Sequence, residues 1–166
     1  MMRLRALGFL FILMTGQVVA VEGQAAPEWR ISEWLISQHH CPFCVRLKQE
    51  IIHPMRISGD YEDKVVITEI LLDSDENIRD FKGASVSPGA IADSYRVWVT
   101  PTLLFLDHTG REVHKRMLGV NTIEMYSYYL DASLAASLRA VHTGDRGYVL
   151  TKDDISGDAP GYDQLY

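Results

Sequence analysis

The stretch His39-His40-Cys41-Pro42-Phe43-Cys44 contains both cysteines of the 166-residue chain. Apolar and basic residues recur after it at helical spacing, which predicts a helix: Val45, Leu47, Lys48, Ile51, Ile52 and Met55. Pro42 suits the first position of this helix, because its missing N–H needs no partner there. Cys41 is therefore expected at the N-cap, where unpaired backbone N–H groups and the helix dipole favour a thiolate. Cys41 is the predicted nucleophile and Cys44 the resolving thiol.

A Cys-x-x-Cys pair has three other uses: a structural disulfide, a metal site and haem attachment. A structural disulfide between Cys41 and Cys44 would close a loop so short that it adds little stability. A metal site would need His39 or His40 beside the two thiolates, but adjacent histidines do not readily face one ion, and no second Cys or His pair follows the cysteines at zinc-finger distance. Haem attachment requires a histidine directly after the second cysteine, where this chain has valine. Redox chemistry is favoured, with the first two uses as alternatives.

The first twenty residues have the pattern of a signal peptide. Arg3 and Arg5 form a basic head, residues 6–15 carry no charge, and Val18-Val19-Ala20 fits a cleavage site. Cleavage after Ala25 is the alternative. The apolar segment is shorter than the ~20 residues of a typical membrane span, although an uncleaved anchor is a further alternative. Residues 1–20 are therefore predicted to direct the protein to the periplasm.

The charge balance argues against nucleic acid as a partner. Hydrophobic residues make up 47% of the chain, which suits one domain with a real core. Removing Arg3 and Arg5 with the signal peptide leaves 14 basic against 22 acidic residues, so the net charge falls from −6 to −8. Such a surface repels nucleic acids and anionic membranes. In an oxidising compartment, a cysteine pair becomes oxidised unless something reduces it.

The elements around the cysteines alternate between strand and helix. Residues 34–36 and 64–72 are apolar and are expected to form buried strands. The intervening helix from Cys41 should end or kink at Pro54. Residues 73–87 are polar and are expected to form a loop.

The second half is predicted to contain a short helix at residues 88–96, a strand at 102–106 and, after a turn, a return strand at 111–118. A final helix over residues 122–141 should begin at an Asn121 cap. Its expected buried stripe comprises Tyr126, Tyr129, Leu130, Leu134 and Leu138. Residues 143–166 are expected to be a flexible tail. This order predicts an α/β domain, residues 21–142, with a mixed sheet and helices on both faces.

Three segments in this order resemble the thioredoxin superfamily. They are the Cys41–Cys44 pair at a helix start, the segment from Tyr95 to Phe105 with Thr100-Pro101, and the C-terminal hairpin and helix. Together they cover residues 33–138. The resemblance implies a three-layer α/β/α fold with a central mixed sheet of about four strands. It also implies a dithiol–disulfide cycle at Cys41 and Cys44 without a bound cofactor.

The same resemblance implies that the Thr100–Pro101 bond is cis and that an extended substrate segment binds beside it; the alternative is an ordinary trans proline at an edge strand. The chain departs from thioredoxin at three places. His40 replaces the tryptophan before the first cysteine. Pro42-Phe43 is closer to glutaredoxins and some periplasmic isomerases, and Leu35 occupies the place of a buried acid. His40 is a candidate for the missing proton-transfer group; the alternative is an exposed histidine without a role.

The signal peptide and the Cys-Pro-x-Cys pair resemble the secreted branch of the superfamily, above all the periplasmic thioredoxins of bacterial sulfur-oxidation clusters (SoxS type). This resemblance implies a monomeric reductase that keeps a partner protein's cysteine usable, re-reduced by a membrane electron donor of the CcdA/DsbD type. One alternative is a DsbA/DsbG-like oxidase or isomerase. The other is a copper- or zinc-binding chaperone that uses His40, Cys41 and Cys44.

Overall fold

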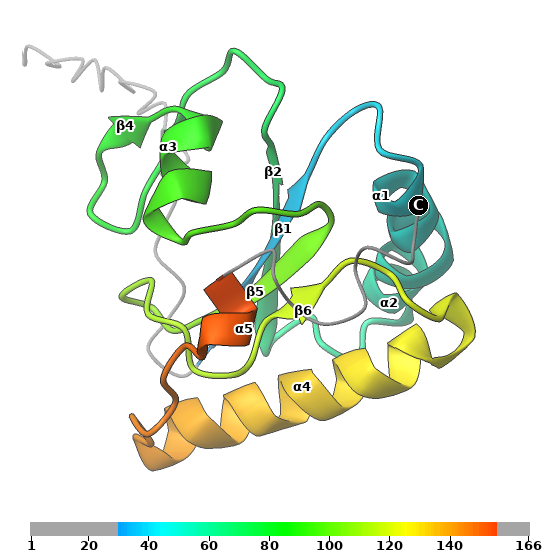
Figure 1. The fold of residues 1–166 in the computed structure, drawn as a ribbon. Coiled ribbons are helices and arrows are strands. Elements are labelled where there is room, and N and C mark those ends of the chain that lie inside the picture. Colours follow the sequence, from blue (N-terminus) through cyan, green and yellow to red (C-terminus); the bar gives the residue numbers. More distant parts are fainter. Residues whose placement is uncertain (1–29, 156–166) are drawn as a thin grey trace, which may run out of the picture.

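The computed structural model describes residues 30–155. Its central sheet has four strands in the order β2-β1-β5-β6 (Figure 1). These strands are β1 Ile31–Ser37, β2 Val65–Leu71, β5 Thr102–Leu106 and β6 Met117–Leu118. Strand β2 is parallel to β1, whereas β5 is antiparallel to β1 and β6 to β5. The mixed sheet predicted from the sequence is confirmed.

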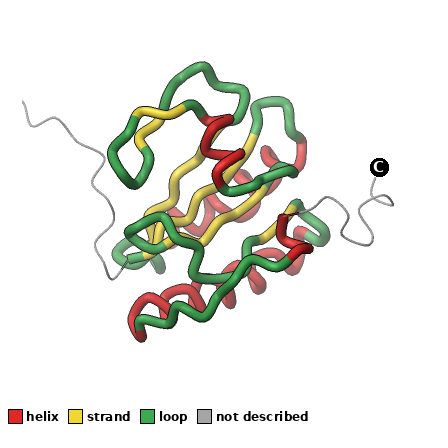
Figure 2. The backbone as a smooth tube through the Cα atoms, turned by 60° about the vertical axis from the view of Figure 1, so that its left-hand side comes forward, coloured by secondary structure: helices red, strands yellow, loops and turns green. Residues whose placement is uncertain are grey.

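The sheet is covered on both faces, which gives three layers (Figure 2). Successive side chains of a strand point to opposite faces. On β1, Ile31 and Leu35 therefore join a core with the helices that follow the cysteines and with the long helix α4, Ile123–Thr143. Trp34 and Ile36 face the other side, against the short helix α3, Pro88–Ser94. The three-layer α/β/α architecture is confirmed.

The helix after the cysteines continues past Pro54. It consists of α1 Pro42–Leu47, a π-helical turn η1 Lys48–Ile52, and α2 His53–Ser58. A proline removes one helix hydrogen bond and crowds the preceding turn, and the wider π-helical turn ends two residues before Pro54. The helix ends at Gly59, whose φ of 76° suits glycine. Of the two expectations for Pro54, the interrupted but continuing helix is the one observed.

Helix α4 differs from the prediction at its start and on one face. Its N-cap is Thr122 rather than Asn121, without a side-chain hydrogen bond. Tyr129 was expected in the buried stripe, but its side chain is 54% exposed. The buried residues of α4 are Ile123, Tyr126, Leu130, Leu134 and Ser137, and Leu138 is half-buried. Tyr129 lies off this stripe because it directly precedes Leu130, and adjacent residues of a helix point about 100° apart around its axis.

Two segments, residues 73–87 and 111–118, differ from the secondary structure predicted from the sequence. Residues 73–87 were expected to be a loop, but they form the small hairpin of β3 Ile78–Arg79 and β4 Ser85–Val86. Phe81 between these strands stacks on Trp34, with 4.7 Å between ring centroids. The predicted return strand 111–118 is reduced to β6 and one bridge between Leu106 and Glu112. In this segment Glu112 and Arg116 form an ion pair. In a regular strand, residues four positions apart lie on the same face but too far apart to pair.

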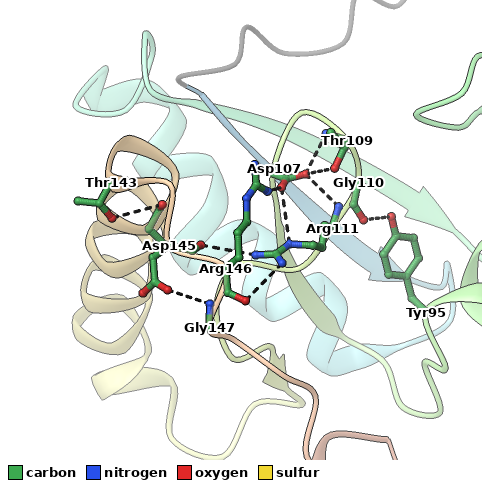
Figure 3. A network of polar contacts seen from close by, with 10 residues as sticks. Tyr95, Asp107, Thr109, Gly110, Arg111, Thr143, Asp145, Arg146 and Gly147 are labelled. Carbon is green, nitrogen blue, oxygen red and sulfur yellow. Dashed lines mark hydrogen bonds and ion pairs between the residues drawn. The ribbon is translucent and has the colours of Figure 1, made fainter.

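Residues 144–155, which we call the strap, were expected to belong to a flexible tail but pack against the domain. The strap includes α5 Lys152–Ile155. Arg146 forms an ion pair with the buried Asp107 (Figure 3). Asp154 is buried beside Arg116, which donates to its backbone carbonyl. The polar residues of the strap thus find partners in the folded domain, through this ion pair and this hydrogen bond. Residues 156–166 lie outside the described part of the chain, as does the predicted signal peptide.

Between residues 30 and 155, none of the helices combines the length and the apolar character that crossing a membrane requires.

Candidate functional site

Cys41 and Cys44 form a disulfide at the start of α1, directly after the loop that leaves β1. Cys41 is the N-cap, and its Sγ accepts a hydrogen bond from the Cys44 backbone N–H at 3.1 Å. Pro42 occupies the first turn, as the sequence predicted. Cys44 is completely buried, whereas Cys41 is partly exposed and Phe43 is 47% exposed. A reactant in solution can therefore reach Cys41 but not Cys44.

The loop before β5 lies against the exposed cysteine. The Thr100–Pro101 peptide bond is cis. The Thr100 carbonyl oxygen lies 3.8 Å from Cys41 Sγ, and the Thr100 hydroxyl donates to Gln38 Oε1 at 3.3 Å. On the other side of the loop, the Gly119 N–H donates to the Pro101 carbonyl at 2.8 Å. The structure thus brings the Cys41–Cys44 pair together with Thr100 and Pro101, although Thr100 lies 59 residues after Cys41 in sequence.

The two histidines before the cysteines differ. His39 Nδ1 lies 2.9 Å from Asp73 Oδ1, and its backbone N–H donates to the same carboxylate. Burial would raise the pKa of Asp73, but these hydrogen bonds and the nearby imidazole outweigh it and lower the pKa. His40, the candidate proton-transfer group, is exposed. His39 therefore attaches the loop to the end of β2, which the sequence analysis did not anticipate.

A second polar group lies where α1 meets the sheet. Lys48 Nζ donates to Glu69 Oε1 at 2.7 Å, and the buried Ser37 hydroxyl donates to the same oxygen. Burial would raise the pKa of Glu69, but the hydrogen bonds from Lys48 and Ser37 and the Lys48 and His39 charges outweigh it and lower the pKa.

Sequence reasoning missed this group, although part of it carried a signal. Lys48 lies four residues after Cys44, a spacing that places two residues on one face of a helix. The approach of Glu69 to Ser37 depends on the β1–β2 register, in which Glu69 pairs with Leu35 and Leu71 with Ser37. The sequence of either strand alone does not determine this register.

One carboxyl is buried in the core below the site. Glu33 of β1 has no solvent exposure, and neither of its carboxyl oxygens has a hydrogen-bond partner within residues 30–155. Burial raises the pKa of Glu33 to about 8. Leu35 and Ser37 lie between Glu33 and the cysteine loop on the same face of β1.

Among the described residues, no group of three or more His, Cys, Asp or Glu side chains is arranged to hold a metal ion. The site instead has the parts that thiol–disulfide exchange requires: a partly exposed cysteine at a helix N-cap, a buried second cysteine bonded to it, and an adjacent loop whose Thr100 carbonyl lies 3.8 Å from the first sulfur.

Residues 14–134 match the family model described as a thioredoxin-like domain. A search of curated proteins found no significant match. Solved structures with a similar fold include oxidised thioredoxin O2 from Arabidopsis thaliana, at 16% identity and a TM-score of 0.45 over 67% of this chain and 82% of that one. A thioredoxin-fold protein from Helicobacter pylori is 17% identical, with a TM-score of 0.46 over 72% and 86%. Malassezia sympodialis thioredoxin is 15% identical, with a TM-score of 0.48 over 70% and 82%.

Proposed function

This chain belongs to the thioredoxin-like family, and its Cys41–Cys44 pair makes it a thiol–disulfide oxidoreductase; from this premise we propose that it is a periplasmic reductase. It keeps a cysteine of a partner protein reduced. The observation that carries the proposal is the position of the Cys41 sulfur, which is accessible at the helix N-cap and lies 3.8 Å from the Thr100 carbonyl.

The proposed cycle transfers two electrons to the partner. The Cys41 thiolate attacks one sulfur of the partner's disulfide, the S–S bond breaks, and the departing sulfur takes up a proton. Cys44 then loses its proton and attacks Cys41 Sγ, which releases the second partner thiol. The reductase is left as the Cys41–Cys44 disulfide found in the structure. Two electrons from a membrane donor of the CcdA/DsbD type restore the dithiol.

The periplasmic location and the SoxS-type assignment are supported by the signal-peptide pattern of residues 1–20 and by the Cys-Pro-x-Cys pair. The substrate segment is proposed to pair with the backbone around Thr100 and Pro101, because these residues border the accessible sulfur. Phe43 is half exposed beside this sulfur and adds an apolar contact for the partner.

A second candidate is a DsbA/DsbG-like oxidase or isomerase, which uses the same two sulfurs in the opposite direction. The reduction potential of the pair separates the two. We would equilibrate the protein, starting at Val21, with glutathione buffers and measure the oxidised fraction. A value near that of thioredoxin, about −270 mV, supports the reductase, whereas a value near that of DsbA, about −120 mV, overturns it.

The partner can be trapped with Cys44→Ala, which leaves the mixed disulfide on Cys41 unresolved. Cys41→Ala serves as the matched control, because it keeps the fold but removes the attacking sulfur. A protein captured from periplasm by the first variant and not by the second is the substrate. Equal capture by both variants would contradict the proposed role of Cys41.

A further inference from the structure

The contact between Lys48, Glu69 and Ser37, which we call the Lys48 cluster, joins three elements beside the buried cysteine. Ser37 is the last residue of β1, Glu69 is in β2, and Lys48 begins the π-helical turn. One carboxylate oxygen, Glu69 Oε1, accepts from both other side chains. Lys48 and Glu69 are each about one-third exposed, at 32% and 34%, so their charges are only partly screened by water.

Helix geometry directs Lys48 toward Cys44. The Lys48 backbone N–H donates to the Cys44 carbonyl, so the two residues are one turn apart on the same face. In a helix, a side chain leans toward the N-terminus and covers the turn before its own Cα. For Lys48 this is the turn of Cys44. Lys48 and Glu69 also line a pocket of about 230 Å³ together with Leu35.

The reaction requires the buried Cys44 to ionise, and this needs a stabilising group nearby. In the resolving step Cys44 must become a thiolate while it is completely buried, and burial disfavours the charged form of a thiol. A nearby cation favours that form. We propose that Lys48, held by Glu69 and Ser37, is the positioning residue that stabilises the Cys44 thiolate in the resolving step. The inference rests on the dithiol chemistry of the proposed function, but not on its redox direction.

Glu69 acts in this proposal as an anchor rather than as a proton acceptor. Because its hydrogen bonds lower its pKa, Glu69 stays ionised near neutral pH and is a weak base for a thiol. Its negative charge also opposes the effect of Lys48 on Cys44. Removing that charge while Lys48 remains should therefore favour the thiolate, which is opposite to the effect of removing Lys48.

Other charged groups border the cluster. His39 and Asp73 lie at the end of β1 and β2, and His53 and Arg56 of α2 line the same pocket as Lys48. Arg46 of α1 pairs instead with Glu50 and, at 4.0 Å, with Glu124. Arg46 thus provides a matched control: a cation on the same helix whose partners lie elsewhere.

The test uses single turnover with one equivalent of a chromogenic aromatic disulfide. Attack by Cys41 releases the first coloured thiolate, and attack by Cys44 on Cys41 releases the second, independently of reagent concentration. The pH dependence of each phase is recorded for wild type and for K48M, K48R, E69Q and R46M. Unfolding in denaturant is measured for every variant.

We expect K48M to shift the midpoint of the second phase upward by about half a unit to one unit, which makes it roughly 3- to 10-fold slower at neutral pH. The first phase should change little. K48R should keep the wild-type midpoint because it keeps the charge, R46M should match wild type, and E69Q should shift the midpoint downward.

Three results would overturn the proposal: a second phase in K48M that coincides with wild type, equal slowing in K48M and K48R, or slowing in E69Q like that in K48M. The last result would make Glu69 the proton acceptor. If K48M does not fold, the direction of the E69Q shift decides. A second phase that persists in Cys44→Ser would instead show that the dithiol chemistry itself fails.

Discussion

At one end of the central sheet, where β1 finishes, the cysteines lie on a loop and a helix start, close to solvent. At the other end, where β5 finishes, Asp107 is buried and forms an ion pair with Arg146 of the strap, 39 residues further along the chain (Figure 3). Nearby, Glu112, Arg116 and Asp154 are buried together. At the cysteine end the two cysteines belong to one helix start and Cys41 is partly open to solvent, whereas at the strap end buried charges pair with residues from the C-terminal segment of the chain.

This difference leads to a division of labour that can be tested. Groups at the cysteine end take part in the reaction and include few buried charges, so their removal should change activity more than stability. Groups at the strap end are buried and paired far from Cys41, so their removal should change stability more than activity. The following variants test this contrast in order of decreasing effect.

Cys41→Ser should have the largest effect, on activity alone. Serine cannot form a disulfide, so disulfide reduction should fall on the order of 10³-fold or more. Serine is a good N-cap residue, so the unfolding free energy in the presence of reductant should change by less than about 1 kcal/mol. Insulin reduction and urea unfolding of the reduced proteins measure the two quantities. Normal insulin reduction by this variant would contradict the role of Cys41.

Arg116→Met should show the reverse pattern. Arg116 pairs with Glu112 through two nitrogens and donates to the Arg96 and Asp154 carbonyls. Its loss leaves a buried carboxylate without its cation, which costs about 3–5 kcal/mol of unfolding free energy. The reduction rate per folded molecule should stay within about twofold of wild type.

Lys115→Met is the control for Arg116→Met, since its side chain is exposed on the neighbouring position. Its effect on stability should stay within about 0.5 kcal/mol. If both variants lose the same stability, the ion pair of Arg116 is not what holds the strap end together.

The same contrast explains which features the sequence could predict. The cysteine pair, its N-cap position and the strands β1, β2 and β5 depend on local patterns, so the sequence was sufficient for them. The strap was taken for a flexible tail because its charges find partners only in the folded protein. The prediction of a return strand over residues 111–118 was wrong for the same reason, because their alternation does not reveal the Glu112–Arg116 ion pair.

The register of the sheet accounts for the rest. Glu69 was read as part of a buried strand, and its approach to Ser37 and Lys48 follows from the alignment of β1 with β2. The buried Glu33 likewise could not be recognised, because it lies beside Ser32 at the start of β1, where a polar residue is equally compatible with the exposed end of a strand. Sequence patterns locate the strands, but the contacts between them decide which polar side chains meet.

Glu33→Gln tests a buried carboxyl group that belongs to neither end of the sheet. Because the pKa of Glu33 is raised to about 8, the folded state keeps a proton that the unfolded state loses near pH 4.5. The wild-type unfolding free energy should therefore decline as the pH rises from about 5 to 8. Glutamine stays neutral, so the variant should be more stable by roughly 3 kcal/mol at pH 7 and similar to wild type near pH 4.

Urea unfolding across this pH range measures the effect, with the exposed Glu76→Gln as control. A wild-type stability that is constant or rises between pH 5 and 8 would show that Glu33 is not buried with its proton. Reduction rates at neutral pH should be unchanged, because Leu35 and Ser37 separate Glu33 from the cysteine loop.

Asp107→Asn should have the smallest effect and tests whether the two ends are independent. Burial would raise the pKa of Asp107, but hydrogen bonds from Thr109, Arg111 and Arg146 outweigh it and lower the pKa. A depressed pKa stabilises the fold above the unfolded-state value near pH 4, and this contribution is lost as the pH falls below it. The variant should thus lose about 1–3 kcal/mol at pH 7 and progressively less in acid.

Hydrogen exchange locates that loss within the molecule. In Asp107→Asn the amides of the strap should exchange faster while those of α1 keep their protection, because Arg146 loses its anchor but the cysteine helix does not. Asp153→Asn, an exposed change on the strap itself, should leave both regions unaffected. If α1 also exchanged faster, or if disulfide reduction slowed, the strap would be coupled to Cys41 through the sheet, and the cysteine end could no longer be treated as an independent unit.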